Sequence, residues 1–91
     1  MAMDWSTKQS FDRYMADGDW HMRYGESYER DCYWSDAKDH YYRAANCYQQ
    51  AYDIARSADD YSQNDAYRKQ REAESNFRSI SHKAWDHEHN R

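Results

Sequence analysis

The sequence predicts an all-α protein, a small antiparallel bundle of three to four helices in one domain over residues 1–91. Small and aromatic residues recur at intervals of three and four along nearly the whole chain, which is the periodicity of an amphipathic helix. The chain contains no proline, and no segment shows the alternating pattern or the β-branched run of a strand. These observations together favour helices joined by short connections.

The material for a core is unusual. Leu and Val are absent, there are two Ile, and most of the large side chains are aromatic, including ten Tyr. A mean hydropathy of -1.55 would normally indicate disorder. However, 18% of the residues are aromatic and they recur periodically, which indicates a folded domain with a small core. Self-association into a homo-oligomer, or a partner protein, would complete such a core.

The first helical pattern spans residues 5–16, and either Asp4 or Ser6 could cap its start. Two interpretations of the following Asp-Gly-Asp segment at residues 17–19 are open. In one, the helix stops at Gly18 and a separate helix covers residues 20–31. In the other, a single helix continues, because one stripe stays in phase through Phe11, Met15, Gly18, Met22 and Gly25. A glycine inside a helix costs about 1 kcal/mol relative to alanine, and only close approach of a neighbouring helix would compensate two of them. The break is favoured, because Asp-Gly-Asp is typical of a loop.

The central helix is predicted over residues 35–58, a segment of strong helix formers without a breaker. One face is made of small and aromatic residues: Ala37, Tyr41, Ala44, Ala45, Tyr48, Ala51, Tyr52, Ala55 and Ala58. Because this face has only Ala and Tyr, its neighbours must approach closely and carry bulk of their own.

The last helix is predicted over residues 63–86, with residues 87–91 as a frayed tail. Its core face consists of Ala66, Gln70, Ala73, Phe77, Ile80 and Ala84.

The segment from Tyr24 to Ala44 resembles the tetratricopeptide signature. Residues of the matching size follow in the signature's order: Tyr24, Gly25, Tyr28, Trp34, Ala37, Tyr41 and Ala44. The leading Trp of the signature falls on His21 and its helix-ending Pro on Gln49, so the resemblance is to a single, imperfect repeat. It implies a close-packed helical hairpin, and in that family stacked hairpins bind extended peptides or helices in a groove.

Charge and composition narrow the function classes. The net charge of -4, with acids and bases interspersed, disfavours nonspecific binding to nucleic acid or anionic membranes. No apolar run is long enough for a signal peptide or a membrane span. Cys32 and Cys47 match neither a zinc nor a redox motif and are expected to be two free, buried thiols, typical of a cytoplasmic protein.

No motif for catalysis or for a cofactor is present, so a non-enzymatic protein without a cofactor is predicted. His40 and Cys47 cannot form a catalytic pair, because seven helical residues separate them by about 10 Å along the axis. His40 is expected instead at the edge of the buried face, with its ring nitrogens satisfied.

Protein–protein interaction is the predicted function. Aromatic side chains at the helix surface are the expected contacts with a partner protein: Tyr42, Trp20, Trp5, Tyr24 and Tyr28. A small acidic protein of this kind suits an adaptor, a chaperone-like peptide binder, or a phage or mobile-element inhibitor of a host complex, including an anti-defence protein.

Two alternatives use the last helix. Its basic residues could bind a nucleic-acid strand: Arg68, Lys69, Arg71 and Arg78. Nearer the C-terminus, His82, Asp86 and His89 share one helix face at a spacing that can hold a divalent metal.

Overall fold

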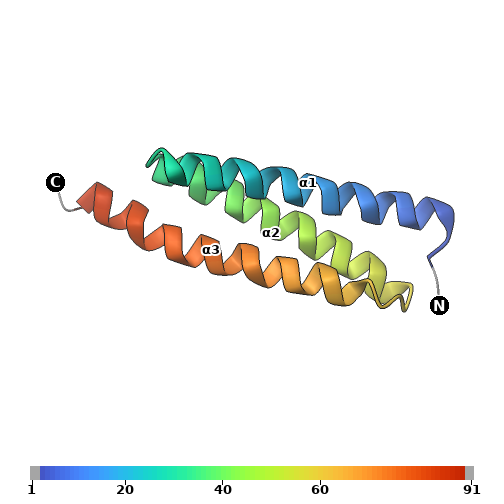
Figure 1. Cartoon of the computed structure of the whole chain (residues 1–91). Coiled ribbons are helices and arrows are strands. Elements are labelled where there is room, and N and C mark those ends of the chain that lie inside the picture. The colour runs from blue at the N-terminus through green and yellow to red at the C-terminus, as the bar shows by residue number, and fades with distance from the viewer. Residues whose placement is uncertain (1–2, 90–91) are drawn as a thin grey trace.

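Three helices run antiparallel in a computed structural model that describes residues 3–89, except the side chains of residues 87 and 88. They are α1 (Trp5–Arg30), α2 (Trp34–Ser57) and α3 (Gln63–His89), and the described residues include no strand. Helix α2 packs along its length against both neighbours, whereas α1 and α3 hardly meet (Figure 1). The molecule is a rod of 54 × 16 × 13 Å. None of the helices described is apolar enough over a sufficient length to cross a membrane.

Helix α1 is continuous, so the predicted break at residues 17–19 is wrong, and with it the separate helices 5–16 and 20–31. The alternative, one helix with an unbroken stripe, is confirmed. Gly18 and Gly25 are both buried in it, and each faces a tyrosine ring of α2. Close packing against these rings offsets the low helix propensity of glycine.

The helix ends follow local signals. The Asp4 carboxylate accepts a hydrogen bond from the Thr7 amide at 2.7 Å, so Asp4 is the N-cap of α1, and this bond lowers the pKa of Asp4. The two connections contain the non-glycine residues with positive φ, Cys32 at 64° and Asp59 at 53°. Helix α3 continues to His89, past the predicted end at Asp86, and residues 90–91 of the predicted tail lie outside the described residues.

The core follows the predicted stripe of the central helix. Its buried residues keep a spacing of four and three throughout: Ala37, Tyr41, Ala44, Tyr48, Ala51 and Ala55. Both neighbours contribute to the same core, α1 with Phe11, Met15 and Met22, and α3 with Ala66, Ala73, Ile80 and Ala84. The small residues let the helices approach closely, and the two tyrosines fill the space between them.

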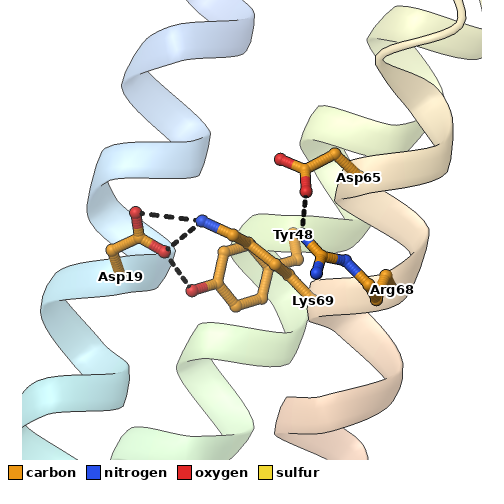
Figure 2. Close-up of polar contacts among 5 residues, drawn as sticks. All are labelled: Asp19, Tyr48, Asp65, Arg68 and Lys69. Atoms are coloured by element: carbon orange, nitrogen blue, oxygen red, sulfur yellow. Dashed lines mark hydrogen bonds and ion pairs between the residues drawn. The ribbon is translucent and has the colours of Figure 1, made fainter.

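Two polar bridges join α1 to α3 above these tyrosines. The Tyr48 hydroxyl donates to the Asp19 carboxylate at 2.5 Å, and Lys69 of α3 reaches the same carboxylate at 3.1 Å. Figure 2 shows the lysine crossing the Tyr48 ring, beside the Asp65–Arg68 ion pair on α3.

The second bridge repeats this arrangement nearer the α1–α2 turn. The Tyr41 hydroxyl donates to Glu29 at 2.7 Å, and Lys83 of α3 pairs with Glu29 at 3.3 Å. The Lys83 ammonium also lies 5.5 Å from the centre of the Trp34 ring. The buried hydroxyls of Tyr41 and Tyr48 therefore both have a partner, as burial of a polar group requires.

Candidate functional site

A cluster of aromatic and histidine rings covers one side of the α1–α2 hairpin. Its members, named here the aromatic–histidine face, are Trp20, His21, Tyr24, Tyr28, Tyr33 and His40. Three of them follow one another at single-turn intervals along α1, so helical periodicity alone aligns Trp20, Tyr24 and Tyr28. The structure thus brings together three of the five predicted partner-binding residues.

His40 of α2 lies at the centre of this face. Its ring stacks on Tyr24 and on Tyr28, with the ring centres 5.4 Å apart in both cases. Trp20 packs on Tyr24 at 4.2 Å and meets His40 edge to face at 6.3 Å. The separations of 5.4 and 6.3 Å are those of favourable aromatic pairs, and Trp20 and Tyr24 are in still closer contact, so the rings hold one another in place.

A short contact between two histidines ties α1 to α2 within the face. Nδ1 of His21 lies 3.0 Å from Nδ1 of His40, which is hydrogen-bonding distance. Burial, together with the neighbouring His40 and Arg43, lowers the pKa of His21, while Asp17 and Asp39 oppose this shift. His40 is half-buried, as its predicted edge position requires, and its Nδ1 has a partner in His21.

Although the rings are packed together, the face is open to solvent. Trp20 is 50% exposed and Tyr24 is 41% exposed. Stacking covers part of these rings and leaves the rest of Trp20 and Tyr24 accessible to solvent. Such a surface offers indole, phenol and imidazole hydrogen-bond donors next to apolar area, a composition typical of binding sites.

Tyr42 lies on the other side of α2, in a separate groove against α3. It is 54% exposed, and its ring packs against Phe77 at 5.7 Å. The pair lines two hollows, of about 550 Å³ toward Trp85 and about 280 Å³ toward Gln49 and Arg78. The contact with Phe77 accounts in part for a large aromatic residue on the polar side of the predicted helix.

Trp5 stands apart from both surfaces. It is the first residue of α1, it is 76% exposed, and its ring pairs with none of the rings that the structure describes. The aromatic contacts predicted from the sequence therefore divide into a cluster, a groove and an isolated residue.

The predicted basic surface of α3 is largely occupied by internal contacts. Lys69 is bound to Asp19, and Arg68 pairs with Asp65. The Arg71 guanidinium lies 5.9 Å from the Tyr67 ring, whereas Arg78 is exposed beside the groove of Tyr42.

The predicted metal ligands are not assembled into a site. Among the residues whose side chains are described, no three His, Cys, Asp or Glu are placed to hold a metal ion. Nδ1 of His89 instead lies 2.8 Å from the Trp85 carbonyl oxygen, and its ring stacks on Trp85. His82 and Asp86 do not join it in a cluster.

Both cysteines are free thiols, as predicted, but they differ in environment. Cys32 is exposed in the α1–α2 turn, where its φ is 64°, contrary to the expectation that it is buried. Cys47 is half-buried, and burial raises its pKa.

The sequence did not predict that His21 and Tyr33 belong to the aromatic–histidine face, or that His21 pairs with His40. A usable signal exists, because counting outward from the turn places His21 and His40 about two to three helical turns away on facing helices. That signal needs the register of the hairpin, which the sequence pattern does not supply.

No protein-family model matches the chain, and no curated protein or solved structure shows significant similarity to it.

Proposed function

We propose that this chain is a non-enzymatic binding protein that contacts another protein through the aromatic–histidine face. The observation that carries the proposal is the continuous ring cluster at the surface, in which half-exposed Trp20 and Tyr24 pack on each other and around His40. Tryptophan and tyrosine dominate the binding energy of many interfaces, and their loss typically costs 2 kcal/mol or more at such positions.

Preorganisation supports the same conclusion. The rings of the face already stack on one another, so a partner would not have to immobilise them one by one on binding. Their helices are long and pack along their whole length, which holds the surface in one shape. A rigid aromatic surface of this kind fits a shallow groove or the face of a helix in the partner.

The scaffold around the face suits a protein that works by occupying another protein's surface. The interspersed charges would set the choice of partner and the rate of association. We therefore keep an adaptor, or an inhibitor of a host complex such as phages and mobile elements carry, as the proposed biological role. The tetratricopeptide-like character of the α1–α2 hairpin stays a prediction, and the aromatic–histidine face lies on that same hairpin.

Nucleic-acid binding by α3 has less support. Two of its four predicted contacts, Arg68 and Lys69, are already in ion pairs with acidic residues of the protein. A polyanion would have to displace these carboxylates before it could use the cations.

A matched pair of tryptophan variants tests the proposal. Trp20→Ala removes an anchor of the face, whereas Trp5→Ala removes an exposed tryptophan of the same helix outside it. Immobilised wild-type protein and both variants are used for affinity capture from a lysate of the cells that produce the protein, and dissociation constants are then measured for the partner that is captured. Circular dichroism confirms that each variant keeps its helicity.

We expect Trp20→Ala to weaken binding of the partner about 30-fold or more, which corresponds to 2 kcal/mol, and Trp5→Ala to bind like the wild type. Tyr42→Ala tests the groove between α2 and α3 in the same assay. If Tyr42→Ala abolishes binding while Trp20→Ala has no effect, the contact surface is the groove and the proposed face is wrong.

A further inference from the structure

The distance between His21 and His40 restricts where their protons can be. Each Nδ1 carries either a proton or a lone pair, and two protons or two lone pairs facing each other at 3.0 Å would repel. The ring centres are 5.2 Å apart, much farther than the two nitrogens, so the Nδ1 atoms face each other across the contact. A single proton must therefore lie between them.

The proton count of the pair then defines three states. When both rings are neutral, one ring holds its proton on Nδ1 and donates to the bare Nδ1 of the other. A first added proton binds an outer Nε2 nitrogen and leaves the hydrogen bond in place, now as an N–H⁺···N bond of the stronger, charge-assisted kind. A second added proton has to bind the accepting Nδ1, which removes the hydrogen bond and sets two positive rings against each other.

Because other rings pack on the two histidines, loss of the hydrogen bond between them would disturb the whole aromatic–histidine face. The His40 ring stacks on Tyr24 and on Tyr28, whose own centres lie 6.3 Å apart, and Trp20 packs on His21 with ring centres 5.1 Å apart. The histidine rings cannot separate without disturbing these stacks. A single positive charge is tolerated here, because aromatic faces attract cations.

Charged groups from both packed helices act on the pair. Asp17 of α1 and Asp39 of α2 favour protonation of His21, whereas Arg43 of α2 and His40 itself oppose it. Helix α3 packs on the other flank of α2, where Tyr42 meets Phe77. Burial adds to the groups that oppose protonation, so the pKa of His21 is lowered overall. The contact between the two rings adds the requirement for a single proton between them.

We propose that His21 and His40 form a proton-binding site that holds one shared proton and makes the aromatic–histidine face pH-sensitive, with the face disrupted when both rings are protonated. The site's chemistry depends on the chain alone. Its consequence, release of a partner as the pH falls from 7 toward about 5, rests on the proposed function.

Nuclear magnetic resonance of the histidine ring nitrogens in the full chain tests the proposal between pH 8 and 5. Long-range ¹H–¹⁵N correlations report which nitrogen of each ring is protonated. The variants are His40→Phe, which keeps a ring against the two tyrosines but removes the nitrogens, and His82→Gln, a control that removes an exposed histidine of α3.

We expect one ring of the pair to hold its proton on Nδ1 at pH 8, and the signals of His21 and His40 to report two shared steps separated by about one pH unit or more. The Trp20 indole signal should shift with the second step, while the Trp5 signal should not. His40→Phe should reduce the His21 titration to a single step with a higher midpoint, and His82→Gln should leave both steps unchanged. If His40→Phe loses its helicity, His21→Phe gives the equivalent test on His40.

Independent one-step titrations of His21 and His40, unchanged when the other ring is replaced, would overturn the inference. This outcome is separate from the proposed function, because the titration needs no partner. Loss of capture in Trp20→Ala together with uncoupled histidines would leave the binding face in place and remove only the proton site.

Discussion

Gly18 of α1 and Tyr48 of α2 depend on each other for space: a Cβ atom at position 18 would lie 2.5 Å from Cε1 of the Tyr48 ring. The contact is repeated nearer the α1–α2 turn, where a Cβ atom at position 25 would lie 2.6 Å from Cε1 of Tyr41. Each glycine therefore provides the room for a buried tyrosine. The tyrosine in turn uses that position to reach a carboxylate of α1, Tyr48 at Asp19 and Tyr41 at Glu29.

Gly18→Ala should destabilise the protein, although alanine is the better helix former. Overpacking against a rigid ring costs about 1–3 kcal/mol, which exceeds the gain of about 1 kcal/mol in helix propensity. Urea unfolding measures the net change, and the same substitution in a Tyr48→Leu background separates the two effects. In the Tyr48→Leu background, Gly18→Ala should lower the free energy of unfolding by less. An equal decrease in both backgrounds would show that the Tyr48 ring does not cause the destabilisation.

Tyr48→Phe should lower the free energy of unfolding by about 1.5–3 kcal/mol, the range for a hydrogen bond to a charged group. The hydroxyl is buried and donates to Asp19, so its loss leaves that carboxylate bound to Lys69 alone. Tyr61→Phe is the matched control, because Tyr61 is 86% exposed. Equal stabilities of the two variants in urea unfolding would argue against a structural role for the Tyr48–Asp19 bond.

The tyrosines should ionise in two groups, with Tyr41 and Tyr48 losing their protons at higher pH than exposed tyrosines. Burial raises the pKa of Tyr48 and of Tyr41 far above the usual value of 10.0, and the hydrogen bonds to Asp19 and Glu29 add to the shift. Because the unfolded chain loses these protons near pH 10 and the folded chain keeps them, stability should fall as the pH rises above 10. An ultraviolet titration should show delayed tyrosines that ionise only as the helical circular dichroism is lost.

Stability should also fall on mild acidification. The pKa of His21 is lowered from 6.5 in the folded protein, so the unfolded chain binds more protons just below that pH. The stability that neutral His21 contributes is fully present above pH 6.5. It is lost as the pH falls from 6.5 to the lower pKa of His21 in the folded protein. Urea unfolding at pH 7.5 and 5.5 measures it, and His21→Phe should show a smaller loss than the wild type. A loss that is just as large in His21→Phe would assign the pH dependence to other groups.

The aromatic residues at the surface show how much of a binding site can be predicted from residue type and position in the sequence. A position off the buried stripe of the helix and a large side chain were enough to single out Trp20, Trp5 and Tyr42, but they do not show which residues act together. The fold places Trp20 in a stacked cluster, Tyr42 in a groove against Phe77, and Trp5 alone at a helix start. That division depends on the neighbours each ring meets across helices.

The sequence by itself determined the helical class, the buried Ala and Tyr stripe of α2 and the core face of α3, because helix propensity and periodicity act within a few turns of one segment. Only the tertiary structure decided that α1 continues through Gly18, since the reason is a ring on another helix. It likewise decided that His40 meets His21, because that contact requires the register in which α1 and α2 pack. Residues distant in the chain become chemical partners only when close packing brings them within hydrogen-bonding reach.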